Sequence, residues 1–347
     1  MFLSMRLSLL VLFGLFAVAC SPVRPTLSDE VTPFPSSTTT PVPAVTTPGT
    51  LPGRPIESTI VPATIPAVDD IPALIDDGVA RAVRTPSGVI VAVLEDRGES
   101  YLVTTPCAGE AVVSGIAASG AHVVLDAGHG GVETGALGPQ GTVEAHLNLA
   151  IAQQVQELLE GAGYTVVQTR TDDYRISIAA RTAIVLALEP SVFVSIHHNA
   201  DPDGPLEGPG SETYFQIDDP DSKRLAGLLY EEAVAGFSSF DVSWVGDTDA
   251  GAKFRRNDRG GNYYGILRRS EGVPAALTEL AFLSNAPEEE LLLTPVFQQA
   301  EALAIANGIV RYLTTDDPGS GFTEPYPRTV PAGPGGGVDN CEDPDFG

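Results

Sequence analysis

The chain has 347 residues and is strongly acidic, with 45 Asp and Glu against 19 Lys and Arg and a net charge of -26. This charge disfavours electrostatic attraction to nucleic acid or to anionic membrane surfaces, so we expect no nucleic-acid partner. The length and the apolar content allow one large domain with additional segments.

Residues 1–20 have the pattern of an export signal. Arg6 supplies a basic start, residues 7–16 an apolar run too short for a confident membrane span, and residues 17–19 small side chains before Cys20. The residues before Cys20 also resemble a lipoprotein signal. Two outcomes stay open, lipidation of Cys20 or simple cleavage and secretion, and we expect membrane contact only through a lipid on Cys20.

Three further segments flank the main domain. Residues 21–70 are dominated by Pro, Thr, Ser and Val without a sustained period, which predicts a disordered linker. Residues 71–118 contain short β-rich runs between turn residues, and we interpret them as a small β module with a packing or spacing role. Residues 316–347 form a tail rich in Gly and Pro.

Strands and helices alternate through the main domain, residues 120–315. This alternation predicts an α/β domain whose sheet has helices on both faces. Strands are expected over residues 122–125, 164–169, 191–196, 212–216, 263–267 and 275–280, and helices over residues 146–160, 177–188, 221–235 and 296–312.

Residues 238–262 are predicted to be a loop rich in Gly, Asp and Ser. The loop contains Trp244 and the basic residues Lys253, Arg255 and Arg256. It is either a surface loop or one rim of a substrate groove. Because it lacks an apolar period of 3.6 residues, we expect no helix across the site, which should be open or gated by a loop.

Cys107 and Cys341 remain as an even pair if Cys20 carries a lipid. In an oxidising compartment such a pair is expected to form a disulfide, which would tie the tail to the segment before the main domain. The alternative is two unpaired thiols.

Several of the five histidines lie where predicted strands end. His129 stands in a glycine-rich turn after the strand at 122–125, and His197 and His198 follow the apolar strand at 191–196. Glu144 opens the helix that comes next after His129. Open α/β sheets bind ligands at the carboxyl ends of their strands, so these side chains are expected to converge on a cation. Two histidines and a carboxylate form the ligand set of a hydrolytic zinc site.

Glu279 lies in a predicted strand that is otherwise nearly all apolar. A carboxylate there is costly unless it has a partner or a catalytic role. A zinc hydrolase needs a second carboxylate to take and return a proton, and Glu279 is our candidate.

Four ordered motifs together resemble the zinc-dependent N-acetylmuramoyl-L-alanine amidases of the bacterial cell wall, the type 3 amidases. They are VVLDAGHGG, GTVEAHLNLA, VSIHHNA and PAALTELAFLSN, within residues 123–313. An intervening segment, with Arg170, Asp173 and Arg181, also resembles the family's pattern. The resemblance implies a phosphorylase/hydrolase-like fold with a mixed, mostly parallel sheet and helices on both faces, here preceded by the small β module.

The resemblance also implies a site. It makes His129, Glu144 and His197 the ligands of one Zn²⁺ per catalytic domain and Glu279 the catalytic carboxylate. Two residues compete for ligand roles. Glu133 stands near the position of a usual Asp and competes with Glu144, and His198, at the place of a usual Ala, competes with His197. Substrate contacts are expected from two further residues, Asn199 and Arg268, of which Arg268 would meet a peptide carboxylate.

The implied activity is hydrolysis of the amide between N-acetylmuramic acid and the L-Ala of the stem peptide, so peptidoglycan is the expected partner. Two alternatives remain, a zinc peptidase that cuts within the stem peptide and an inactive wall-binding scaffold lipoprotein. We expect an exported protein, anchored by lipid or secreted. A regulatory protein partner of unknown identity is a further open alternative.

Overall fold

The computed structural model describes residues 64–68, 71, 73–74, 77–200, 210–242, 250–324 and 337–347. These residues lie within one compact unit, Thr59–Gly347. The predicted export signal with Cys20, most of the predicted linker and Trp244 fall outside the described residues. Among the helices that are described, none is both long enough and apolar enough to cross a membrane.

The main sheet has six strands in the order β10-β9-β11-β8-β6-β7. Strands β11, β8, β6 and β7 run parallel, whereas β9 is antiparallel to β11 and β10 follows β9 in parallel. The strands are β6 (Val123–Ala127), β7 (Val166–Gln168), β8 (Val192–Asn199), β9 (Glu212–Phe215), β10 (Gly251–Lys253) and β11 (Ala275–Phe282).

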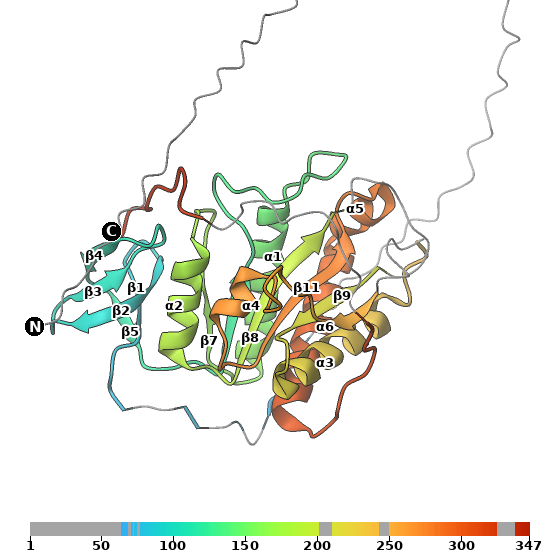
Figure 1. Ribbon diagram of the computed structural model, residues 1–347, viewed down its shortest axis with the longest axis horizontal. Helices are drawn as coiled ribbons and strands as arrows, with labels where there is room; N and C mark the ends of the chain where they lie inside the picture. The colour runs from blue at the N-terminus through green and yellow to red at the C-terminus, as the bar shows by residue number, and fades with distance from the viewer. Residues whose placement is uncertain are drawn as a thin grey trace, which may run out of the picture. The chain divides into compact units, whose positions relative to one another are not determined.

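Helices cover both faces of this sheet (Figure 1). They are α1 (Glu144–Gly161), α2 (Ile178–Leu188), α3 (Pro220–Phe237), α4 (Gly265–Arg269), α5 (Ala286–Leu292) and α6 (Pro295–Thr314). Alternate residues of each strand point to opposite faces, so β8 sends Val194 and Ile196 toward α1, α3 and α6, and Phe193 toward α2 and α4. The predicted α/β fold class, a mostly parallel mixed sheet, is confirmed.

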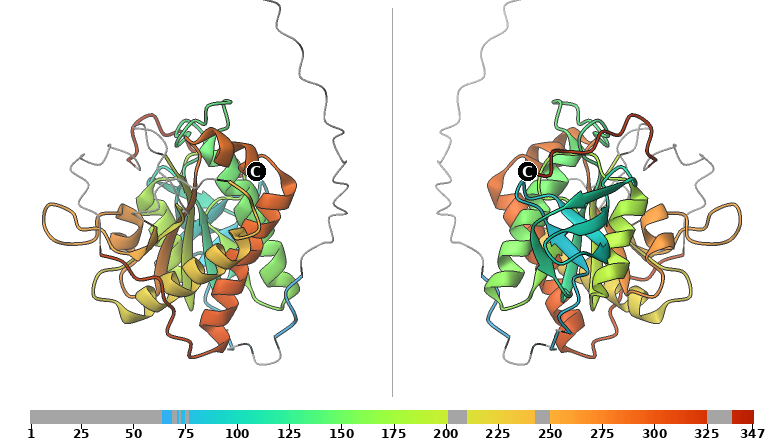
Figure 2. Two further views of the ribbon diagram at one scale, coloured as in Figure 1. Left: turned by 90° about the vertical axis from the view of Figure 1, so that its right-hand side faces the viewer. Right: turned by 90° about the vertical axis from the view of Figure 1, so that its left-hand side faces the viewer.

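A second sheet of five antiparallel strands precedes the main sheet, in the order β4-β3-β2-β1-β5. Its strands are β1 (Ala82–Arg84), β2 (Ile90–Asp96), β3 (Tyr101–Thr104), β4 (Glu110–Val113) and β5 (Ile116–Ala118). One face packs Ala82 and Ile90 into the same core as Ile184 of α2. The small sheet therefore lies beside α2, at the end of the molecule away from α3 (Figures 1 and 2).

The end of the chain returns to the small sheet. Phe346 packs against the core of Val83, Val91 and Val103 on its other face. Cys107 and Cys341 are joined in a disulfide, which confirms the predicted bridge. The boundaries that we assigned to the linker, the β module, the catalytic domain and the tail stay predictions.

One predicted strand is wrong. Residues 263–267 were expected to be extended, but the chain forms the short helix α4, with Tyr264 at the N-cap position. The aromatic and β-branched side chains favour a strand by propensity, but Ile266 and Leu267 are both buried. Consecutive residues of a strand would point to opposite faces, whereas one helical turn brings both against the α2 side. Strand β10 and helix α5 were not predicted.

Candidate metal centre and pocket

His129 stands in the tight turn that follows β6. Its backbone has a φ of 61°, the left-handed region that non-glycine residues rarely adopt. Two buried arginines stabilise the turn: Arg181 donates to the carbonyl oxygen of His129 at 2.5 Å, and Arg170 donates to that of Gly128 at 2.9 Å. The intervening segment that contains Arg170 and Arg181 thus fixes the backbone that presents His129.

Gly128 allows this turn to approach β8. A Cβ atom at residue 128 would lie 2.2 Å from the imidazole of His197, so any larger residue would displace the ring. The imidazoles of His129 and His197 consequently lie edge to face, with their centroids 4.8 Å apart. Two strand ends that are far apart in sequence therefore place two ring systems at one edge of the sheet.

Glu144 is the first residue of α1, and its carboxylate lies between the two imidazoles. Its Oε1 is 3.2 Å from Nε2 of His129 and 3.0 Å from Nδ1 of His197, and its Oε2 accepts a hydrogen bond from the amide of Ala136 at 2.7 Å. The three potential ligand atoms all lie within 4.8 Å of one another. Ligands about 2.1 Å from a tetrahedral zinc ion are roughly 3.4 Å apart, so the set of two nitrogens and one oxygen fits zinc in chemistry and in spacing.

Glu133, the competing carboxylate, lies on the other side of the His129 ring. Its Oε1 is 3.6 Å from Nδ1 of His129, and its Oε2 is 3.7 Å from Arg175. It therefore faces the ring nitrogen that points away from Glu144. The geometry favours Glu144 over Glu133 as the partner of His129 and His197 in a metal site.

The carboxylates control the charge of this cluster. Burial opposes protonation of His129, but the carboxylates of Glu133 and Glu144 outweigh it and raise the pKa of His129 to about 9. The nearby imidazole of His129 in turn lowers the pKa of Glu133 to about 2. Burial would raise the pKa of Glu144, but the two imidazoles hold it well below its ordinary value. His197 differs, because burial lowers its pKa despite Glu144.

His197 and His198 point to opposite faces of β8, as expected for consecutive strand residues. His197 lines the pocket with His129. His198 lies on the α1 and α6 side, where Nδ1 contacts Asn148 at 2.7 Å and Nε2 contacts Glu301 at 3.0 Å. This arrangement favours His197 over His198 for the ligand role.

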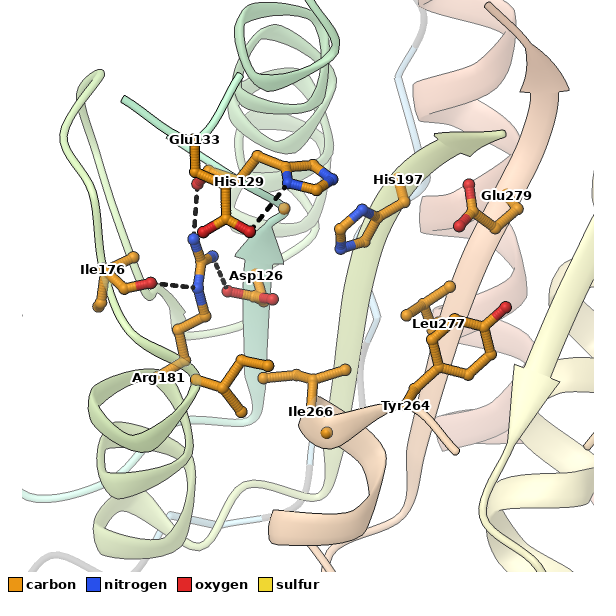
Figure 3. A pocket seen from close by; sticks show the side chains of 13 residues that line it. Asp126, His129, Glu133, Ile176, Arg181, His197, Tyr264, Ile266, Leu277 and Glu279 are labelled. Atoms are coloured by element: carbon orange, nitrogen blue, oxygen red, sulfur yellow. Dashed lines mark hydrogen bonds and ion pairs between the residues drawn. The ribbon is translucent and has the colours of Figure 1, made fainter. Parts of the chain in front are cut away.

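Glu279 lies next to His197 in the parallel register of β11 and β8, and both side chains reach the same pocket (Figure 3). The strand continues to Phe282, two residues beyond the predicted end at residue 280. The pocket has a volume of about 250 Å³. It is lined by Asp126, Gly128, His129, Glu133, Ile176, Ile178, Arg181, His197, Tyr264, Gly265, Ile266, Leu277 and Glu279.

The apolar wall of this pocket was not predicted. Ile176 and Ile178 come from the start of α2, Ile266 from α4 and Leu277 from β11. Beneath them a buried ion pair joins Asp126 to Arg181 at 2.5 Å. Two sequence signals point to this pair, an acidic residue inside the apolar strand β6 and Arg181 in the segment that resembles the family's pattern.

The expected substrate contacts lie elsewhere. Arg268 donates to the carbonyl oxygens of Asn262 and Tyr263, at 2.7 and 2.9 Å, and Asn199 donates to the buried carboxylate of Glu212. Neither Arg268 nor Asn199 is among the described residues that line the pocket, and both roles stay predictions.

The predicted loop at 238–262 is interrupted by β10. Lys253, which the sequence placed in that loop, is buried and pairs with Glu212 at 2.5 Å. Lys253 therefore forms an ion pair inside the fold and does not contribute to a basic rim of the pocket.

Comparison with known proteins identifies the family. Residues 123–311 match Amidase_3, described as N-acetylmuramoyl-L-alanine amidase. The chain belongs to this family. All four motifs with their histidines and acidic residues lie within the matched range, whereas the five-stranded sheet of the Amidase_3 chain lies before it.

Individual relatives cover different shares of this Amidase_3 chain. Uncharacterized protein YqiI of Bacillus subtilis (strain 168) is 33% identical over 213 residues, which are 61% of this chain and 92% of that protein. N-acetylmuramoyl-L-alanine amidase AmiC of Neisseria meningitidis serogroup B is 30% identical over 224 residues, 56% of this chain and 53% of the relative. The solved structure of Cwp6 from Clostridium difficile has a TM-score of 0.50 and 30% identity, covering 56% of this chain and 30% of that one.

Proposed function

We propose that this chain is a zinc-dependent amidase that hydrolyses the amide between the lactyl group of N-acetylmuramic acid and the L-Ala of the stem peptide. The observation that carries the proposal is the convergence of His129, Glu144 and His197 beside a pocket that Glu279 also lines. Membership in the Amidase_3 family supports this choice of bond.

The three converging side chains would hold the ion, and the remaining residues would serve the reaction. Zinc bound there would supply Lewis-acid activation of the scissile carbonyl and of the attacking water. Glu279 takes the proton from that water and returns it to the departing amine of L-Ala, so one carboxylate acts first as base and then as acid. Ile176, Ile266 and Leu277 form an apolar wall of the pocket beside these groups.

Replacement of the carboxylate tests this assignment. Glu279→Gln keeps the shape of the side chain but removes its ability to accept a proton, so turnover of purified peptidoglycan should fall roughly 10²- to 10⁴-fold. Zinc content should stay at the wild-type level, because Glu279 is not a ligand. A Glu279→Gln enzyme with wild-type turnover would contradict the proposed role.

A digest of peptidoglycan distinguishes the proposal from the two alternative functions. Mass spectrometry of an amidase digest should show glycan chains free of peptide together with intact stem peptides that begin with L-Ala. Shortened stem peptides on intact glycan would instead indicate a zinc peptidase. A chain that binds peptidoglycan without releasing either product, with or without zinc, would be the inactive scaffold.

We also propose that the protein is exported and held at the membrane by a lipid on Cys20. The export pattern of residues 1–20 and the cell-wall substrate support this location. Cys20→Ala should move the protein from the membrane fraction to the soluble fraction. Equal membrane association of the variant and the wild type would favour secretion without an anchor.

A further inference from the structure

A buried polar pair, His198 and Glu301, lies behind the candidate metal centre, on the face of β8 opposite the pocket. Nε2 of His198 is 3.0 Å from Oε1 of Glu301, a residue of α6. Neither side chain is exposed to solvent. Fully buried polar groups lose their hydration, and pairing recovers only part of that free energy. The fold therefore retains this pair at a cost in stability.

Asn148 connects this pair to the metal centre. Its Oδ1 lies 2.7 Å from Nδ1 of His198, and its Nδ2 lies 3.2 Å from the carbonyl oxygen of Gly128 and 3.3 Å from Oε1 of Glu144. Asn148 is itself fully buried, one turn after Glu144 in α1. An unbroken chain of contacts thus runs from α6 through β8 and α1 to a proposed ligand.

The donors and acceptors around the side-chain amide of Asn148 allow only one of its two orientations. A carbonyl oxygen only accepts, so Nδ1 of His198 donates to Oδ1 of Asn148, and the NH₂ group of Asn148 faces Gly128 and Glu144. The flipped amide would place Oδ1 against two acceptor oxygens. The carboxylate of Glu301, in turn, holds the imidazole of His198 in the plane that makes the first hydrogen bond.

We propose that His198 and Glu301 are positioning residues that act through Asn148 on the carboxylate of Glu144. Oε1 of Glu144 faces the imidazoles of His129 and His197, and it also accepts a hydrogen bond from the backbone amide of His198 at 3.3 Å. With Oε2 held by the amide of Ala136, these contacts fix the rotation of the carboxylate before an ion binds. This inference rests on the proposed zinc function and predicts that the buried pair of His198 and Glu301 raises the affinity for zinc.

The competing explanation is that the pair only holds α6 against the sheet. His198→Ala alone cannot separate the two, because it leaves Glu301 buried without its partner and is expected to destabilise the fold. The double variant His198→Leu/Glu301→Leu removes both partners of the pair together, which is commonly tolerated, and leaves only Oδ1 of Asn148 without its donor. A purely structural pair would then leave zinc affinity unchanged in the folded protein.

The experiment measures the zinc dissociation constant of the full chain by competition with a chromogenic chelator. Loss of a group that hydrogen-bonds a ligand typically weakens binding about 10- to 100-fold, and we expect Asn148→Ala in this range and the double variant near its lower end. Glu301→Gln is the matched control, because it keeps a hydrogen-bonding partner for Nε2 and should bind zinc nearly as the wild type does. His146→Gln, an exposed histidine of α1, should also have no effect.

Thermal unfolding of each metal-free variant accompanies the binding measurement. Wild-type zinc affinity in the double variant would overturn the inference while leaving the proposed function intact. Failure of the wild-type protein itself to bind zinc would instead refute the proposed function. Weaker zinc binding in a variant whose metal-free form unfolds at the wild-type temperature is the supporting result.

Discussion

His197 and His198 are consecutive residues of β8, but their side chains lie in two different environments. The side chain of His197 is 17% exposed and lines a pocket, where its neighbours are the other proposed ligands and Glu279. The side chain of His198 is completely buried between α1 and α6 and is held by Asn148 and Glu301. The alternation of side chains along a strand can therefore place a proposed metal ligand and a residue that positions another ligand at adjacent positions of the sequence.

Removal of His197 should have the largest effect of any substitution at this strand. His197→Ala deletes one of three proposed ligands, so bound zinc should fall from one ion per chain to near zero and amidase activity to background. The His198→Leu/Glu301→Leu protein should still contain one zinc ion after dialysis against buffer without chelator. Elemental analysis of the two purified proteins makes the comparison. Full zinc occupancy in His197→Ala would remove His197 from the ligand set.

A second contrast compares a buried ion pair below the pocket with a surface network. Arg181 pairs with Asp126, and their side chains are 5% and 2% exposed. Arg181→Met leaves a buried carboxylate without its cation, which should cost about 3–5 kcal/mol and lower the Tm by roughly 6–20 °C. Arg311, whose side chain is 31% exposed among three carboxylates, is the matched control, and Arg311→Met should cost at most about 1 kcal/mol.

Calorimetry of the two arginine variants tests whether burial or the number of partners decides stability. Equal losses of unfolding free energy in Arg181→Met and Arg311→Met would contradict the distinction between buried and exposed ion pairs. Arg181 also donates to the carbonyl oxygen of His129, so its replacement should loosen the turn and weaken zinc binding. Arg311 instead pairs with Glu231 and Glu232 of α3 and with Asp317 after α6, so zinc binding in its variant should be unchanged.

The convergence of the three proposed ligands could be predicted because it follows from local rules. His129 follows β6, His197 lies near the end of the parallel strand β8, and Glu144 begins α1, so the topology alone brings them to one edge of the sheet. The support of the site could not be predicted in the same way. The contacts of Arg170 with the carbonyl oxygens of the turn, and of Glu301 with His198, join residues 42 and 103 positions apart.

The fold was predictable to a similar depth. Long periodic helices and apolar strands, such as α1 and β8, were expected close to their observed bounds. The short elements α4 and β10 were not, because a single helical turn or a three-residue strand carries too little periodicity to overcome propensity. In both cases tertiary packing decides: Ile266 and Leu267 turn toward α2, and Lys253 reaches the carboxylate of Glu212.

Glu133 should give the smallest effect and the finest test of the comparison, because it combines the two environments. It lines the pocket, yet its carboxylate also contacts His129 and Arg175, so it resembles both a ligand and a support. Since it faces Nδ1 of His129 and not the cluster, Glu133→Gln should keep one bound zinc ion and weaken zinc binding no more than about tenfold. Glu144→Gln should lose the ion, and the two variants differ from the wild type by the same chemical change. If Glu133→Gln is the variant that loses zinc, the carboxylate ligand has been assigned to the wrong side of the imidazole.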